Sequence, residues 1–101
     1  MREPKNTYID IAKKLCARYN PYIEHRDEYP EYRKYTDEEL NQEYIKTAIH
    51  DIHMGYADRI VGYYDKWYRY NRMDDGNAYD EGVRVALSNP DCKPDMRIIP
   101  A

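Results

Sequence analysis

Apolar and aromatic residues recur at steps of three and four between positions 44 and 70. The members of this stripe are Ile45, Ile49, Ile52, Tyr56, Ile60, Tyr63, Trp67 and Tyr70. At an advance of about 100° per residue along an α-helix, all of them fall within a sector of roughly 80°. The pattern therefore predicts a long central helix with one face turned toward a core.

The start of this central helix is expected after Thr36, because Thr36 and Glu39 have the spacing of a capping box. A single helix of roughly 36 residues would be about 54 Å long, which exceeds the breadth of a compact domain of this size. Gly55 is the natural place for a bend or break. The sequence therefore predicts one helix over about 37–54 and another over about 56–73.

Three small residues, Ala48, Gly55 and Gly62, lie seven apart on one flank of the stripe. A line of small side chains lets a second helix approach closely. Together with the excess of apolar residues on this part of the chain, this line of small residues predicts a homodimer formed through the helix. The substitution Gly55→Leu should disrupt such a homodimer.

Two shorter helices are predicted beside the central one. Thr7 and Asp10 make a plausible capping box for a helix over about 7–19, which the dipeptide Asn-Pro then ends. The run Asp-Asp-Gly-Asn at 74–77 predicts a turn, followed by a final helix over about 78–88.

The remaining segments are a connector over 20–36 and a tail over 89–101. The connector is rich in charge and tyrosine and contains two prolines, which favours a partly helical course. The tail contains three prolines and is expected to be extended. No segment alternates with a period of two, so the 101 residues predict an all-α, single-domain bundle of three to four helices.

The aromatic composition is unusual, with 13 Tyr, one Trp and no Phe. A tyrosine hydroxyl must be hydrogen-bonded or stay at a wet boundary. Tyrosine is also enriched at protein interfaces and in paratopes. An interface is one explanation, and codon bias or tyrosines lining a shallow core is the other.

Charge and hydropathy exclude several classes of partner. The chain carries 16 Lys and Arg against 19 Asp and Glu, so as a whole it attracts neither nucleic acid nor an anionic membrane. It has no apolar run near the roughly 18 residues of a membrane span and no signal-peptide segment, which predicts a cytoplasmic protein. Cys16 and Cys92 lack metal-site spacing and are expected to be free thiols.

The run His50-Asp51-Ile52-His53 resembles the HD dyad of metal-dependent phosphohydrolases, in which a helical His and Asp bind a metal that activates water. The resemblance implies a metal site at His50, Asp51 and His53, with His25 as an upstream ligand. It also implies a later acid, for which the candidates are Asp74, Asp75 and Asp80. Against it, such domains are larger, and helical geometry turns Asp51 away from both histidines. We expect two solvent-side histidines and no cofactor, with an HD-like hydrolase fragment as the alternative.

A second alternative is a single-stranded nucleic-acid binder, because residues 63–72 interleave aromatic and basic side chains. Asp65 and Arg69, however, have the i, i+4 spacing of a helical ion pair, and Asp51 and Asp58 share their face. The bases are therefore expected to be neutralised on a salt-bridged, solvated face.

The same segment predicts an uncovered surface. On a continuous helix, Ala57, Val61, Tyr64 and Tyr68 form a second apolar stripe beside the first. With only two other short helices available to cover it, we expect a partner surface centred on Tyr64, Trp67 and Tyr68. The connector tyrosines Tyr29, Tyr32 and Tyr35 are the second choice.

We therefore predict a non-enzymatic module that binds a larger protein. The chain has no Gly-rich phosphate loop, and Ser88 lies at a helix end without a positioned base. Small size, the lack of an enzymatic motif and an interface-like composition resemble phage or mobile-element proteins that inhibit host defence enzymes, such as anti-CRISPR proteins. The resemblance is one of type and is carried by no motif.

Overall fold

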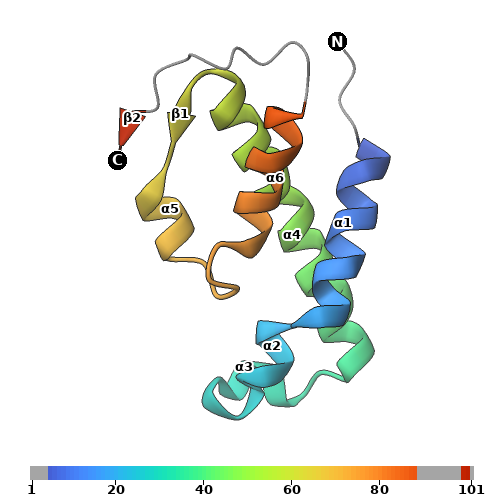
Figure 1. Ribbon diagram of the computed structural model, residues 1–101. Helices are drawn as coiled ribbons and strands as arrows, with labels where there is room; N and C mark the ends of the chain where they lie inside the picture. Colours follow the sequence, from blue (N-terminus) through green and yellow to red (C-terminus); the bar gives the residue numbers. More distant parts are fainter. Residues whose placement is uncertain (1–4, 89–98, 101) are drawn as a thin grey trace.

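The computed structural model describes residues 5–88 and 99–100 (Figure 1). In chain order the helices are α1 (Lys5–Arg18), α2 (Pro21–Glu24), the 3-10 helix η1 (Arg26–Glu28), α3 (Pro30–Arg33), α4 (Asp37–Ile60), α5 (Lys66–Tyr70) and α6 (Asn77–Leu87). Two short strands, β1 (Tyr63–Tyr64) and β2 (Ile99–Pro100), pair in parallel. The predicted all-α fold with a long central helix is confirmed. Most of the predicted tail lies outside the described residues.

The central helix α4 begins as predicted. The Thr36 hydroxyl accepts a hydrogen bond from the Glu39 backbone N–H at 3.1 Å, and the Glu39 carboxylate accepts one from the Thr36 N–H at 2.9 Å. The predicted break at Gly55 is wrong, since α4 runs through this residue for 24 residues in all. The chain reverses direction after α4 at Gly62, whose φ of 81° lies in the left-handed region that favours glycine. The helix predicted over 56–73 is therefore wrong as well.

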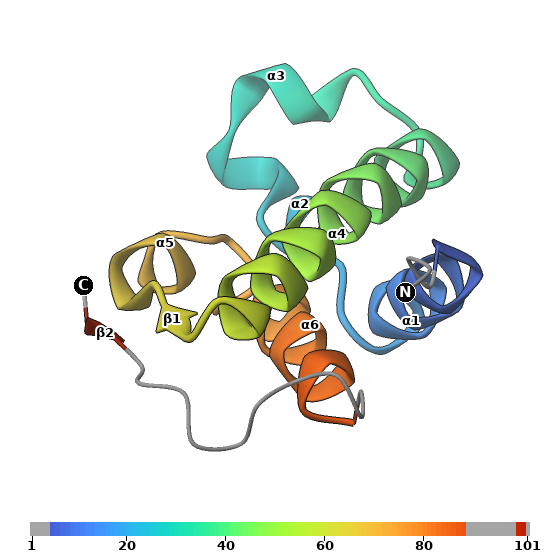
Figure 2. The same ribbon diagram turned by 90° about the horizontal axis from the view of Figure 1, so that it is seen from above.

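Gly55 is needed for packing and does not end the helix. A Cβ atom at Gly55 would lie 2.0 Å from the Tyr79 carbonyl oxygen, and one at Gly82 would lie 1.9 Å from the Ile52 carbonyl oxygen. The backbones of α4 and α6 thus touch where the helices cross (Figure 2). The close approach predicted at Gly55 is made by α6 of the same chain. The predicted homodimer loses this support and stays an untested prediction.

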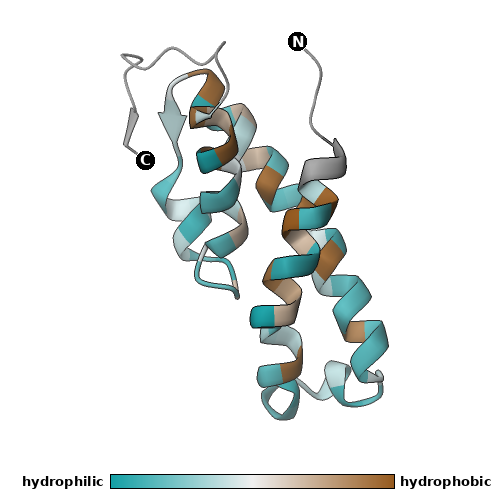
Figure 3. Ribbon diagram, turned by 45° about the vertical axis from the view of Figure 1, so that its right-hand side comes forward, coloured by the Kyte–Doolittle hydropathy of each residue, from teal (hydrophilic) through white to brown (hydrophobic). Residues whose placement is uncertain are grey.

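The core lies where α1 and α6 pack on α4. Its buried members are Tyr8, Ala12 and Leu15 from α1, Tyr44, Ala48, Ile52 and Tyr56 from α4, and Ala78 and Ala86 from α6. Hydrophobic residues lie along these three helices in Figure 3. Ile52 and Tyr56 of the predicted stripe are in the core, whereas Trp67 and Tyr70 are exposed. Beyond Ile60 the helical spacing of the stripe no longer places residues on one face, because α4 ends there.

Two of the short helices begin at prolines. Pro21 begins α2 and Pro30 begins α3, so the connector is partly helical, as predicted. Asn20 caps α2 by accepting a hydrogen bond from the Tyr22 N–H at 2.9 Å. The first helix begins two residues before Thr7, so this residue lies inside α1 and is not its N-cap.

Candidate functional site

Four tyrosines of α4, α5, α6 and β1 donate their hydroxyl protons to aspartates. The pairs are Tyr44 with Asp74 at 2.7 Å, Tyr64 with Asp80 at 2.9 Å, Tyr68 with Asp51 at 2.6 Å and Tyr79 with Asp58 at 2.7 Å. A buried hydroxyl needs an acceptor, and here a carboxylate provides it. This pairing satisfies the hydroxyls of the buried Tyr44 and Tyr79 and of the half-buried Tyr64 and Tyr68.

Burial and these contacts raise the pKa values of the four phenols. Burial and the hydrogen bond to Asp51 raise the pKa of Tyr68 to about 12. Burial is also the main reason why the pKa values of Tyr44, Tyr64 and Tyr79 are raised. All four therefore remain neutral hydrogen-bond donors at physiological pH.

The short helix α5 is held to α4 and α6 by side-chain hydrogen bonds. Asp65 caps it by accepting a hydrogen bond from the Tyr68 N–H at 2.9 Å. The Arg69 guanidinium donates twice to Asp80, with Nε–Oδ1 2.8 Å and Nη2–Oδ2 2.6 Å. Beyond its end, Arg72 Nε donates to Asp51 Oδ2 at 2.9 Å. The five residues of α5 are thus fixed by a cap at the start and by bonds to aspartates of α6 and α4.

The predicted Asp65–Arg69 ion pair is wrong, because Asp65 caps α5 and Arg69 binds Asp80 instead. Both arginines of the segment are neutralised, but by acids of α6 and α4 and not by acids of their own helix. The sequence could not show this, since the partners come together only after the chain reverses at Gly62.

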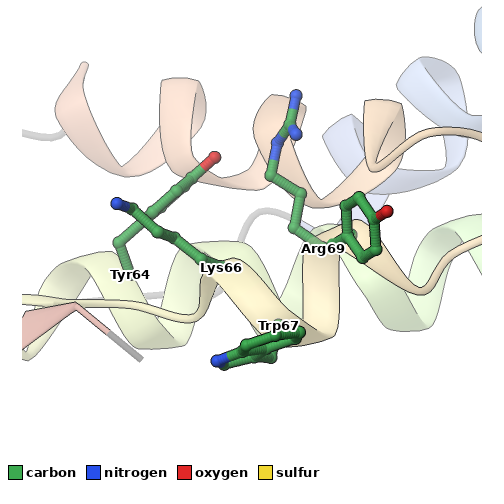
Figure 4. A pocket seen from close by; sticks show the side chains of 5 residues that line it. Tyr64, Lys66, Trp67 and Arg69 are labelled. Atoms are coloured by element: carbon green, nitrogen blue, oxygen red, sulfur yellow. The ribbon is translucent and has the colours of Figure 1, made fainter.

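The outer side of α5 presents two large aromatic side chains. Trp67 is 64% exposed and Tyr70 is 76% exposed, and their ring centroids lie 6.4 Å apart with the planes nearly perpendicular. Trp67 points away from α6, on the opposite side of α5 from Tyr64 and Arg69 (Figure 4). We name the exposed residues Trp67 and Tyr70 the α5 patch. Together with Tyr64, Lys66 and Arg69 they line an open hollow of about 550 Å³.

Of the three residues predicted to centre the partner surface, only Trp67 is exposed. Tyr64 and Tyr68 are half-buried, with ring centroids 5.5 and 5.7 Å from that of Tyr79. The predicted second stripe does not form because α4 ends at Ile60. Sequence reasoning missed Tyr70 by assigning it to the core, and Gly62, taken as a helix stop, would have been the signal.

The connector tyrosines form a separate surface. Tyr29 and Tyr35 are 41% and 40% exposed, and Tyr32 is half-buried between Tyr22 and Tyr29, with ring centroids 5.2 and 5.4 Å away. In both Figure 1 and Figure 2, α3 lies away from α5. The two predicted surfaces therefore do not combine into one.

The residues of the HD-like run point in different directions. His50 is exposed, and the His53 ring lies against Tyr8 with a centroid distance of 6.0 Å. Asp51 is 1% exposed and accepts hydrogen bonds from Tyr68 and Arg72. Within residues 5–88 and 99–100, no three His, Cys, Asp or Glu side chains are placed to hold a metal ion. The hydrolase alternative thus lacks a free Asp51 carboxylate.

A smaller cavity of about 170 Å³ lies between α2, α4 and the loop after α5, and Asp51 and Asp74 are among its lining residues. Asp51 is engaged by Arg72, and Asp74 accepts hydrogen bonds from Tyr44 and from the N–H groups of Gly76 and Ala78. The carboxylates that line this cavity are thus used by the packing of the chain itself.

Comparison with protein-family models, curated proteins and solved structures gave no match to this chain. In the described part of the chain, each helix is too short or too polar to cross a membrane.

Proposed function

We propose that this chain is a non-enzymatic interaction module that binds a larger protein through the α5 patch. The observation that carries the proposal is the exposure of Trp67 and Tyr70 on a helix fixed by a cap and two arginine–aspartate pairs. Tryptophan and tyrosine are enriched among the residues that dominate binding energy. A rigid presentation lowers the entropy lost on association.

The exposed surface of Trp67 and Tyr70 is large enough to contribute substantially to the free energy of binding. A tryptophan or tyrosine side chain buries about 150–250 Å² when fully covered. At exposures of 64% and 76%, covering both residues would remove roughly 280 Å² from water. At about 25 cal/mol per Å², this contributes up to about 7 kcal/mol, from which the cost of association is subtracted.

The test is capture of a partner from the native host, followed by affinity measurement with variants of the α5 patch. Trp67→Ala and Tyr70→Ala should each weaken binding by about 2 kcal/mol, which is roughly thirtyfold. Both variants should stay folded, because both side chains lie outside the core. Ile9→Ala on α1 is the matched control, as it removes an exposed apolar side chain from another helix.

Unchanged affinity in the Trp67→Ala, Tyr70→Ala double variant would contradict the proposal. The connector tyrosines Tyr29, Tyr32 and Tyr35 would then be the next surface to test. Tyr64→Ala and Tyr68→Ala are poorer tests, because each removes a hydrogen bond to an aspartate of α6 or α4.

The identity of the larger partner stays a prediction from size and composition. We propose host defence enzymes, the targets of phage and mobile-element inhibitors of the anti-CRISPR type, as the first class to assay. The hydrolase and nucleic-acid alternatives are less well supported, because Asp51, Arg69 and Arg72 are engaged within the chain.

A further inference from the structure

The hollow beside the α5 patch is lined mainly by hydrogen-bond donors. Its lining side chains are Tyr64, Lys66, Trp67, Arg69 and Tyr70. Lysine, tryptophan and arginine side chains donate hydrogen bonds and accept none. The Tyr64 hydroxyl and the Arg69 guanidinium already donate to Asp80. The Trp67 indole N–H and the Tyr70 hydroxyl, in contrast, have no hydrogen-bond partner within residues 5–88 and 99–100. Two donors on exposed aromatic rings are thus available to acceptors of another molecule.

The charges around the α5 patch largely cancel. Arg69 is paired with Asp80, whose hydrogen bonds are the main reason why the pKa of Arg69 is raised, and the exposed Asp75 adds to this rise. Lys66 directly follows Asp65 in the chain and lies on the opposite side of α5 from Trp67 (Figure 4). A nucleic acid fits poorly here, because phosphate binding draws on several available bases. The surroundings favour an uncharged ligand.

Trp67 and Tyr70 form an aromatic surface about as long as three residues of extended chain. The five residues of α5 extend over about 7.5 Å, and the two ring centroids lie 6.4 Å apart with nearly perpendicular planes. A polyproline II segment rises about 3.1 Å per residue, so three of its residues span about 9 Å. Such a segment has no internal hydrogen bonds and proline has no N–H, so it presents carbonyl acceptors without donors. The carbonyls of a helix or a paired strand are mostly bonded within their own element.

We propose that the α5 patch binds a proline-rich segment of the partner in the polyproline II conformation. The proposal rests on the proposed function and gives the chemistry of the segment that docks. The pyrrolidine rings pack on Trp67 and Tyr70, since aromatic-lined grooves suit such segments. Backbone carbonyls of the segment accept hydrogen bonds from the indole N–H and the phenol hydroxyl. Because the segment is already extended before it docks, it loses little conformational entropy.

The test uses three labelled probes of defined chemistry with the full chain. The first is octaproline, the second is an alanine-based helical peptide with two leucines four positions apart, and the third is a single-stranded oligothymidine. Fluorescence anisotropy at low and moderate salt measures the affinities. Octaproline should bind roughly tenfold more tightly than either other probe. Salt should change its affinity less than about twofold, because the contact uses no ion pair.

Two conservative variants isolate the hydrogen bond from the packing. Tyr70→Phe keeps the ring and removes the hydroxyl, so it should weaken octaproline binding roughly fivefold. Tyr35→Phe is the matched control, since it removes the hydroxyl of a tyrosine in the connector that is 40% exposed, and it should change the affinity less than about twofold. Trp67→Ala should weaken binding by about tenfold or more.

Several results would overturn the proline-rich proposal. They are the absence of octaproline binding, equal or tighter binding of the leucine peptide or of the oligothymidine, and equal effects of Tyr70→Phe and Tyr35→Phe. Each would show that the patch does not select an extended segment with free carbonyls.

Competition against the captured partner separates this proposal from the proposed function. Displacement of the partner by octaproline would support both. A partner that the Trp67→Ala, Tyr70→Ala double variant loses, but that octaproline does not displace, would retain the docking site and refute its preference for proline. A partner that the double variant still binds would refute the docking site itself.

Discussion

Replacing Gly55 by alanine tests the packing that holds the fold together. Helix propensity alone predicts that Gly55→Ala stabilises α4 by about 1 kcal/mol. The new Cβ, however, would lie 2.0 Å from the Tyr79 carbonyl oxygen, so α4 and α6 must move apart. A separation of roughly 1 Å or more restores an ordinary contact distance. Overpacking of this kind costs up to about 3 kcal/mol, and the rigid backbone atoms at Gly55 favour the upper figure.

The net expectation is a loss of about 2 kcal/mol in the free energy of unfolding, from a total of about 5–15 kcal/mol for a domain. Urea denaturation followed by circular dichroism measures it, and the melting temperature should fall by roughly 10 °C. His50→Gly and His50→Ala, at an exposed position of α4, calibrate the propensity difference within this helix. A Gly55→Ala variant as stable as the wild type would refute the contact between the helices.

Three further predictions concern the polar interior and the metal alternative. Tyr68→Phe should lower the free energy of unfolding by about 2 kcal/mol in urea titrations, because Asp51 loses a donor, whereas Tyr35→Phe should cost less than about 0.5 kcal/mol. Burial raises the pKa of Tyr68 to about 12, so its protonated form favours folding. The stabilisation is complete below the ordinary pKa of about 10 and is lost as pH rises through the folded value, so urea midpoints should stay level to about pH 9 and then fall. A level midpoint at pH 11 would contradict this. Finally, the chain desalted after incubation with Mn²⁺, Fe²⁺ or Zn²⁺ should retain no stoichiometric metal by atomic absorption. One bound equivalent that His50→Ala abolishes would instead support the hydrolase alternative.

Local signals in the sequence predicted much of the fold. The capping box of Thr36 and Glu39, the prolines that begin α2 and α3, and the absence of strand periodicity each depend on neighbouring residues. The end of α4 could not be placed because Gly55 and Gly62 look alike in sequence. Only the three-dimensional contact with Tyr79 shows that the first permits packing and that the second reverses the chain.

The candidate site was predicted in part for a similar reason. Trp67 was identified, whereas Tyr64 and Tyr68 turn inward because Asp80 and Asp51 accept their hydroxyl protons. These aspartates lie 16 and 17 positions away in the chain, so no helical spacing connects them. A wheel drawn for a continuous helix places each of these side chains on the wrong surface.

Trp67 also determines what optical spectroscopy can report about this protein. It is the single tryptophan among 101 residues and is already 64% exposed in the folded state. Its emission should therefore sit near that of a solvated indole and shift little on unfolding, so a denaturation curve read from it would miss the main transition. A blue shift on adding a partner would, in contrast, report contact at α5 directly. In this chain the indole is a reporter of docking, and the tyrosines are the reporters of folding.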